Sequence, residues 1–278
     1  MALPHYAVLG APVAHSLSPR IHAEFARQCG IDMLYVAIDT AADGFEATLE
    51  RFRLAGGVGA NVTAPDKIAA ASAAQTLSPR ARRAGAVNTL AWRDNHWYGD
   101  ITDGSGLVRD LRDRRDFNLS RTRVLLIGAG GAARAVAPAL LDADIAQLVV
   151  ANRTRANAWD LVDALHDSDR AMACTLEELP GIGSFDLVLN AVPPDEDDAI
   201  PDYPPAVLGA DSTAVDLNYG PRALPFIAWA KSHGCTRTGD GLGMLVEQAA
   251  DSFELWHGVR PQTEAVYAQL RMGGALAG

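Results

Sequence analysis

The sequence predicts an α/β protein with two domains, the second of them built on a doubly wound parallel sheet. Strands alternate with helices along most of the 278 residues, a rhythm that is typical of this class. One apolar strand over residues 123–127 leads directly into a glycine-rich turn and then a helix, as in the first unit of a doubly wound sheet. Apolar residues make up 49% of the chain and charged residues 21%, which excludes a disordered or fibrous protein.

The first part of the chain is expected to hold strands over residues 6–10, 34–38, 58–62, 86–92 and 96–98. Ser18 is predicted to cap a helix whose first residue is Pro19. Asp43-Gly44-Phe45-Glu46 resembles a capping box at the start of the next helix. Arg93-Asp94-Asn95 is the predicted turn between the last two strands, which therefore form a hairpin.

The second part is expected to hold strands over residues 123–127, 148–151, 185–192 and 213–217. A helix follows the glycine-rich turn and runs to about Leu141, and Thr154 is predicted to cap the helix after the next strand. The acidic, proline-rich residues 193–205 are expected to form a surface loop. One long helix begins after Gly241.

These elements divide the chain into three parts. Residues 1–104 are predicted to form an α/β domain that binds the substrate. Residues 105–240 are predicted to form a nucleotide-binding domain of the Rossmann type. Residues 241–278 are expected to form a helical segment that packs back on the first domain.

Charge and composition argue against several classes of partner and site. The net charge is −10, from 24 basic and 34 acidic residues, and no basic patch interrupts it, so nucleic-acid binding is not expected. No apolar run approaches the length that crosses a membrane, and no signal peptide is visible. Cys29, Cys174 and Cys235 form no pairing motif, which fits the reducing cytoplasm. The seven histidines form no close ligand pair, so no metal site is predicted.

A dinucleotide site is predicted at the glycine-rich turn. Gly128, Gly130 and Ala133 fit the pattern G-x-G-x-x-A between a strand and a helix. Backbone N–H groups of such a turn approach a pyrophosphate, whose charge then lies at the positive end of the helix. The alternative is a tight turn that only packs the helix on the sheet.

The end of the next strand favours NADP over NAD. An NAD site places an acidic residue there, where it bonds the ribose 2′-hydroxyl. Asn152-Arg153-Thr154-Arg155 contains no acid, and its guanidinium groups can bind a 2′-phosphate through paired, charge-assisted hydrogen bonds. The alternative is that both arginines are solvated surface residues.

Two hydroxyl groups lie close to the start of the first helix. Ser16 and Ser18, with the free N–H groups of the helix, can hold an anion such as a carboxylate. The alternative, an ordinary helix cap, explains Ser18 but not Ser16.

Other polar residues of the first part lie at strand ends, where α/β sheets gather their sites. They are Asn61, Thr63, Lys67, Asn88 and Asp103. A lysine and a carboxylate that converge there can transfer a proton to or from an alkoxide. The competing interpretation is a surface ion pair. Four polar strand ends facing one cofactor domain make this alternative weaker.

With these segments in view, the sequence resembles the shikimate dehydrogenase (AroE) family. Matching segments span nearly the whole chain: His15-Ser16-Leu17-Ser18-Pro19, Asn61-Val62-Thr63 with Pro65 and Lys67, Gly85-Ala86-Val87-Asn88-Thr89, Thr102-Asp103-Gly104, Gly128-Ala129-Gly130-Gly131-Ala132, Asn152-Arg153-Thr154, and Asp240-Gly241-Leu242-Gly243-Met244-Leu245 with Gln248. The resemblance implies reversible reduction of 3-dehydroshikimate to shikimate with NADPH, on the route to chorismate and the aromatic amino acids. It leaves a homodimer open.

The resemblance also implies site residues. Lys67 would act as the acid/base group or stabilise the developing alkoxide, with Asp103 as its partner. Substrate contacts are expected at Ser16, Ser18, Asn61, Thr63, Asn88, Tyr219 and Gln248. Cofactor contacts are expected at Gly128, Ala129, Gly130, Gly131, Ala132, Asn152, Arg153, Thr154, Arg155, Leu217 and Gly241.

Two positions depart from the family pattern. Ile101 replaces the asparagine that usually precedes Thr-Asp-Gly, and Val192 replaces a threonine beside the nicotinamide. Both departures leave open a quinate/shikimate dehydrogenase that uses NAD, or an aminoshikimate enzyme. A relative that binds shikimate or a nucleotide without turnover is a further alternative, against which Lys67 and Asp103 argue.

Overall fold

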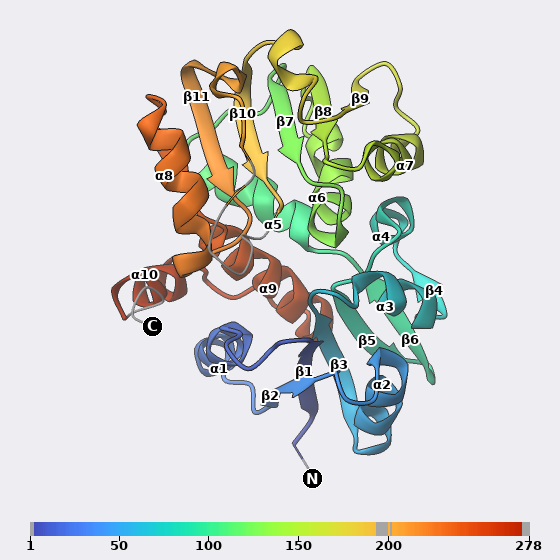
Figure 1. The fold of residues 1–278 in the computed structure, drawn as a ribbon. Coiled ribbons are helices and arrows are strands. Elements are labelled where there is room, and N and C mark those ends of the chain that lie inside the picture. The colour runs from blue at the N-terminus through green and yellow to red at the C-terminus, as the bar shows by residue number, and fades with distance from the viewer. Residues whose placement is uncertain (1–2, 193–199, 201, 274–278) are drawn as a thin grey trace.

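The computed structural model describes residues 3–192, 200 and 202–273 and contains two six-stranded sheets (Figure 1). The predicted loop over 193–205 therefore lies mostly outside the described residues. Within the described part of the chain, no helix is both long and apolar enough to cross a membrane.

The first sheet has the strand order β2-β1-β3-β5-β6-β4. Its strands are β1 (His5–Gly10), β2 (Leu34–Asp39), β3 (Gly57–Val62), β4 (Thr76–Leu77), β5 (Thr89–Arg93) and β6 (His96–Asp100). β1 pairs in parallel with β2 and β3, whereas β5 runs antiparallel to β3 and β6. The predicted hairpin is confirmed, and Asp94 and Asn95 take the positive φ angles that a two-residue turn of this kind requires.

Four helices accompany this sheet, and two of the predicted caps are wrong. The helices are α1 (Ser18–Cys29), α2 (Phe45–Leu54), α3 (Lys67–Ala73) and α4 (Pro79–Ala84). Ser18 is the first residue of α1 rather than its cap, because Leu17 already has a helical backbone conformation. Asp43 does not cap α2, because the residue at the N-cap position is Gly44 and no side chain makes a capping hydrogen bond there. The Asp43 carboxylate pairs instead with Arg51 at 2.6 Å.

The second sheet is parallel throughout and has the strand order β12-β11-β10-β7-β8-β9. Its strands are β7 (Arg123–Ile127), β8 (Gln147–Ala151), β9 (Ala171–Cys174), β10 (Phe185–Asn190), β11 (Leu208–Asp216) and β12 (Arg237–Gly239). Counted from β7, this is the order 3-2-1-4-5-6 of a doubly wound dinucleotide-binding sheet. The predicted fold class is confirmed, and the strand order reverses between β7 and β10.

Helices cover both faces of the second sheet. They are α6 (Gly131–Asp142), α7 (Arg155–Leu165) and α8 (Leu224–Ser232). Leu126 of β7 packs in one apolar cluster with residues of α6, whereas Leu125 packs on the other face with Phe226 of α8. Burial on both faces explains why these strands are continuous apolar runs. Thr154 precedes α7 as predicted, but its side chain makes no capping hydrogen bond.

Three further helices join the two sheets: α5 (Asp103–Arg109), α9 (Leu242–His257) and α10 (Glu264–Met272), with a π-helical turn over Asp110–Arg114. In Figure 1, α9 crosses the middle of the molecule between the two sheets. Its residues Val246 and Phe253 share a buried cluster with Ile21 and Phe25 of α1, which confirms the predicted return to the first part of the chain.

Helix α5 packs backbone against backbone with helices on two sides. A Cβ atom at Gly106 would lie 2.8 Å from the backbone nitrogen of Gln248 in α9. A Cβ atom at Gly104 would lie 2.9 Å from the carbonyl oxygen of Ala135 in α6. Both distances are shorter than ordinary contacts, so glycine at these positions is what lets α5 lie between its two neighbours.

Candidate active site

Lys67 and Asp103, which lie far apart in the sequence, form an ion pair in the structure. Lys67 is the first residue of α3, and Asp103 is the first residue of α5. The Lys67 Nζ lies 2.6 Å from the Asp103 Oδ2, and the two side chains are only 13% and 8% exposed. Such shielding strengthens the pair relative to one in open solvent, so it differs from the surface ion pair that the sequence left as an alternative.

Two amide side chains from distant segments lie beside this pair. The Asn88 Nδ2 donates to the Gln248 Oε1 at 3.1 Å and to the Thr102 hydroxyl at 2.9 Å. The Thr102 hydroxyl also donates to the Gln248 carbonyl oxygen at 3.0 Å. Because Thr102 directly precedes Asp103, these bonds tie the carboxylate to α9 and to the start of β5. The structure thus brings Asn88, Gln248 and Asp103 together.

Asn61 lies in a buried polar network on the same side of the first sheet. Its Oδ1 accepts a hydrogen bond from the Tyr35 hydroxyl at 2.7 Å. Its Nδ2 donates to the Ser252 hydroxyl at 2.9 Å, and to the Asn88 carbonyl oxygen at 3.2 Å. Asn61 is 5% exposed, so these bonds fix the orientation of the amide and the β3 end that carries it.

Ser16 lies just before α1, and Ser18 is its first residue. The Ser16 hydroxyl accepts a hydrogen bond from the backbone N–H of Ser18 at 3.2 Å, which orders the turn that leads into α1. Ser18 is buried and faces the Tyr35 hydroxyl. Burial raises the pKa of Tyr35 well above its ordinary value, so this hydroxyl stays protonated.

Tyr219 connects the second part of the chain to this turn. It is half-buried and packs against the apolar cluster of α1 and α9, next to Leu17. Burial raises the pKa of the Tyr219 phenol, and the backbone N–H of Leu17 opposes that shift. Thr63 follows β3 and is also half-buried, with its backbone N–H bound to the Leu9 carbonyl oxygen at 2.9 Å.

The glycine-rich turn lies at the reversal of strand order, between β7 and α6. Gly128 has a φ angle of 105°, which side-chain-bearing residues rarely adopt. Nothing lies within 4 Å of a Cβ atom built on Gly130, so a ligand can approach its backbone. A Cβ atom on Gly131 would lie 3.9 Å from the Lys67 Cβ, so the catalytic candidate lies directly beside the start of α6. Ala129 is buried, so its contact with a ligand would come from its backbone.

The two arginines after β8 differ in their contacts: among the described residues, Arg155 forms an ion pair and Arg153 does not. Arg153 is exposed, whereas the Arg155 guanidinium is hydrogen-bonded to the Glu178 carboxylate. The Asn152 side chain donates to the Thr154 carbonyl oxygen at 2.9 Å, which shapes the turn. Of the two arginines, Arg153 is therefore the better placed to receive a phosphate.

A buried carboxylate supports the loops beside Leu217 and Gly241. Asp216 accepts hydrogen bonds from the Asn190 Nδ2 at 2.9 Å and from the Asn218 Nδ2 at 2.7 Å. Burial raises the pKa of Asp216 to about 6, although these amide donors oppose the shift. The backbone N–H of Gly241 donates to the Asn218 carbonyl oxygen at 2.8 Å. Because Leu217 directly precedes Asn218, Leu217 and Gly241 are close neighbours.

The two departures from the family pattern are accommodated within apolar clusters. Ile101 is 3% exposed and packs in the core of the first sheet, so its side chain does not line the polar wall beside Asp103. Its loop is held instead by Asp100, whose carboxylate accepts two hydrogen bonds from Arg80, at 2.7 and 2.6 Å. Val192 packs against Gly128, and its backbone N–H donates to the Asn190 Oδ1 at 3.2 Å.

Sequence reasoning missed some of the residues that organise the site. Thr102 was part of a matched segment but received no role, although a threonine directly before a candidate carboxylate is a signal. Tyr35 lay in a predicted strand, where nothing in the pattern distinguished it from a core aromatic. Within the described residues, no group of three or more His, Cys, Asp and Glu side chains could hold a metal ion.

Comparisons with known proteins identify relatives of this chain. Three family models match the chain: the shikimate dehydrogenase substrate binding domain over residues 8–90, shikimate / quinate 5-dehydrogenase over 111–196, and the shikimate 5'-dehydrogenase C-terminal domain over 241–271. The shikimate dehydrogenase (NADP(+)) of Stenotrophomonas maltophilia is 56% identical over 272 residues, which cover 98% of this chain and 97% of that protein.

Solved structures extend the comparison to the fold. An Ael1 enzyme from Pseudomonas putida matches with a TM-score of 0.88 and 42% identity, covering 96% of this chain and 98% of that one. The shikimate 5-dehydrogenase of Thermus thermophilus, in complex with NADP(H) and shikimate, matches with a TM-score of 0.84 and 35% identity, covering 97% and 99%. The chain therefore belongs to the shikimate dehydrogenase family.

Proposed function

We propose that this chain catalyses the reversible, NADPH-dependent reduction of 3-dehydroshikimate to shikimate. The observation that carries the proposal is the shielded Lys67–Asp103 pair, which lies beside Gly131, where the glycine-rich turn of the second sheet leads into α6. The relatives named above support the same activity and cofactor. The reaction belongs to the route to chorismate and the aromatic amino acids.

The residues of the second sheet fit a dinucleotide phosphate. The backbone of residues 128–132 would hold the pyrophosphate, because Gly130 leaves open space and the first N–H groups of α6 have no partners within the helix. Asn152, Arg153, Thr154 and Arg155 would hold the adenosine 2′-phosphate, with Leu217 and Gly241 beside the nicotinamide. When bound, NADPH supplies the hydride that reduces the ketone.

Lys67 and Asp103 would handle the proton that this reduction requires. As the ketone becomes an alkoxide, the Lys67 ammonium would donate a proton to its oxygen or stabilise its negative charge. The Asp103 carboxylate, 2.6 Å from the Nζ, keeps the ammonium directed at one place. Because α3 and α5 carry the two groups from separate segments, their alignment depends on the fold rather than on a flexible loop.

The remaining polar residues would hold the substrate. Ser16, Ser18 and Tyr219 converge near the start of α1 and would bind the ring carboxylate. Thr63, Asn88 and Gln248 would contact the ring hydroxyl groups together with the proton-handling pair. Asn61, whose amide is bonded to Tyr35, Ser252 and the backbone of Asn88, would order the wall behind them.

The first test is the substrate and cofactor preference of the purified chain. Formation of reduced nicotinamide would be followed by ultraviolet absorbance with shikimate and then quinate, each with NADP and with NAD. We expect turnover with shikimate and NADP above the other three combinations. Equal or better turnover with quinate and NAD would instead support the alternative dehydrogenase, and binding without turnover would support a non-catalytic relative.

The second test removes the ammonium. Lys67→Met is expected to lower kcat by roughly a hundredfold or more, because general acid–base groups contribute factors of this size. The chain has only one other lysine, Lys231, which is exposed on α8 and provides the matched control Lys231→Met. NADP affinity should remain near that of the unaltered chain in both variants. A folded Lys67→Met protein that retains most of its turnover would contradict the assigned role.

The division of the chain, its assembly and its location complete the proposal. Residues 1–104 would bind substrate, residues 105–240 would bind NADP, and residues 241–278 would pack back on the first part. The three cysteines are free thiols, which supports a cytoplasmic location. A homodimer is tested by light scattering at several protein concentrations, and localisation by fractionation of cells that express the chain.

A further inference from the structure

We infer that Arg271, near the end of α10, is a positioning residue that holds Tyr219 in place for the substrate carboxylate. The inference rests on the proposed function, because it takes Tyr219 as a substrate contact. Arg271 is the last residue that the C-terminal family model matches, and it lies well beyond Gln248 along the chain. Its sequence position alone gives it no role in the reaction. Its contacts supply the argument.

The Arg271 guanidinium binds the carboxylate of Asp240 through two parallel hydrogen bonds. Its Nη1 lies 2.8 Å from the Asp240 Oδ2, and its Nη2 donates to the Oδ1. Asp240 is only 5% exposed, so its charge needs a partner inside the protein. Paired hydrogen bonds of this kind fix the plane of a carboxylate as well as its position.

The oriented carboxylate in turn holds two backbone turns. Its Oδ2 accepts a hydrogen bond from the backbone N–H of Gly220 at 3.3 Å, and its Oδ1 accepts one from that of Leu242 at 3.2 Å. Gly220 directly follows Tyr219, and Leu242 directly follows Gly241. One side chain therefore fixes the turn that carries the tyrosine and the turn expected beside the nicotinamide.

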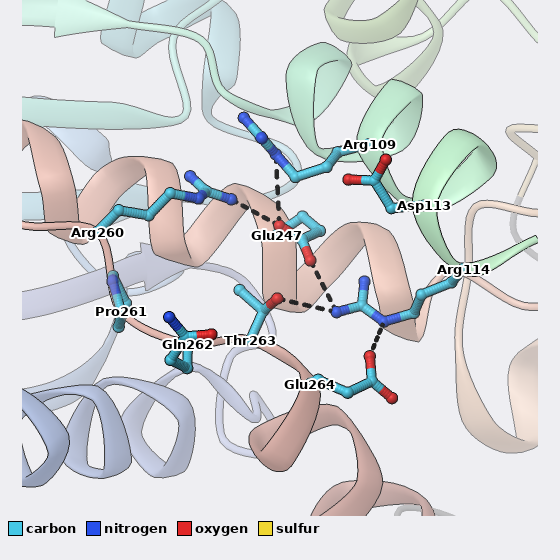
Figure 2. A pocket seen from close by; sticks show the side chains of 9 residues that line it. All are labelled: Arg109, Asp113, Arg114, Glu247, Arg260, Pro261, Gln262, Thr263 and Glu264. Carbon is cyan, nitrogen blue, oxygen red and sulfur yellow. Dashed lines mark hydrogen bonds and ion pairs between the residues drawn. The ribbon is translucent and has the colours of Figure 1, made fainter.

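Helix α10 is itself anchored at its other end, so Arg271 projects from a fixed support. Figure 2 shows this anchor, a pocket in which Arg114 binds Glu264 at 3.1 Å, Thr263 at 3.0 Å and the buried Glu247 at 2.7 Å. The Arg114 guanidinium also lies over the Tyr267 ring, which contacts the Arg271 guanidinium as well. Both ends of α10 are thus tied to the body of the protein.

The same contacts explain why a guanidinium is needed at this position. A lysine would keep a positive charge for Asp240 but would replace two parallel donors by a single point charge. The carboxylate plane would then be free to turn, and its bonds to the Gly220 and Leu242 N–H groups would weaken. The expected consequence is a misplaced Tyr219 in a protein that still folds.

The test compares Arg271→Lys with Arg170→Lys. Arg170 is the matched control because its guanidinium also bonds an aspartate, Asp167, at 3.1 Å, away from the residues assigned to the site. Arg271→Lys should raise the KM for shikimate by about tenfold, as loss of one paired contact predicts. The affinity for NADP should stay within about twofold, because most of its expected contacts, at residues 128–132 and 152–155, do not depend on Asp240. Arg271→Met, which leaves Asp240 without its cation, should give a larger effect if it folds.

A double-mutant cycle with Tyr219→Phe separates positioning from general destabilisation. If Arg271 acts through Tyr219, Arg271→Lys should change the KM for shikimate by less than about twofold once the phenol is absent. Equal effects in both backgrounds, or an Arg271→Lys protein that matches the Arg170→Lys control, would overturn the inference. No oxidation of shikimate by the unaltered chain would instead overturn the proposed function itself.

Discussion

His22 should make the stability of this protein depend on pH. The side chain is fully buried in α1, and its ring stacks on that of Tyr35 with 4.3 Å between centroids. Neither ring nitrogen has a hydrogen-bond partner among the described residues. Burial lowers the pKa of His22 from 6.5 to about 3, an effect that the Asn61 side chain opposes and His257 reinforces. The folded protein therefore keeps this ring neutral under mildly acidic conditions.

The sign and size of the effect follow from the two pKa values. Above pH 6.5 the ring is neutral in the folded and unfolded states, so it costs nothing. Between pH 6.5 and about 3, only the unfolded state binds the proton, and stability is lost as the pH falls. At about pH 5, which lies about 1.5 pH units below the unfolded-state pKa, the free energy of unfolding is lower by about 2 kcal/mol, at ~1.36 kcal/mol per pH unit.

The assay is urea unfolding of the unaltered chain and His22→Phe, each at about pH 7.5 and about pH 5. The phenylalanine keeps an aromatic ring stacked on Tyr35. For each protein we compare the free energies of unfolding at the two pH values, and the contributions of groups that titrate in both proteins cancel between the two comparisons. We expect the unaltered chain to lose about 2 kcal/mol more than the variant on acidification. Equal losses in the two proteins would show that the ring can be protonated within the fold and would refute the reasoning.

Three further predictions test other parts of the structure. Arg153→Ala should lower the ratio of kcat/KM for NADP to that for NAD by roughly ten- to a hundredfold, since a charged hydrogen bond contributes about 1.5–3 kcal/mol. Arg155→Ala should lower this ratio less. An unchanged ratio for Arg153→Ala would contradict the assignment of Arg153 to the 2′-phosphate. Asp216, whose pKa is raised from 3.8 to about 6, should cost the folded state stability as the pH rises. Relative to Asp216→Asn, the unaltered chain should therefore lose about 2 kcal/mol between about pH 4.5 and pH 7 in urea unfolding, and parallel curves would exclude this. Gly106→Ala should lower the free energy of unfolding by roughly 1–3 kcal/mol, because the added Cβ would overlap the α9 backbone. Gly181→Ala is the control, since the space around Gly181 is open and the free energy of unfolding should stay unchanged. Equal stability of the two variants would argue against the close packing of α5 on α9.

The second sheet was the part of the fold most accessible from sequence. Its central strands β7, β8 and β10 are apolar runs buried on both faces, and the turn at Gly128 marks the point where the strand order reverses. The short edge strands β9 and β12 lack such runs and were not predicted. The matched segments also identified Lys67, Asp103, Asn88 and Gln248, which the structure brings to one place. The prediction of the family is confirmed by its relatives.

Local signals were weaker where tertiary contacts decide the structure. Helices α3 and α4 were not predicted, because each is shorter than two full turns and shows little helical periodicity. The caps assigned to Ser18 and Asp43 were wrong, since each side chain has a competing partner or a neighbour that already adopts the helix. No periodicity reveals that Arg271 reaches Asp240, because that contact depends on how α10 folds back.

The two glycine contacts of α5 have a consequence for how this enzyme can diverge. A helix advances by about 100° per residue, so the rotation of α5 about its axis decides where its first side chain points. That rotation is set by the close approach of Gly104 to the backbone of α6 and of Gly106 to the backbone of α9 at Gln248, so it does not depend on which polar side chain position 248 carries. The side chains that would bind the substrate ring can therefore be replaced during evolution while the Asp103 carboxylate stays oriented toward Lys67.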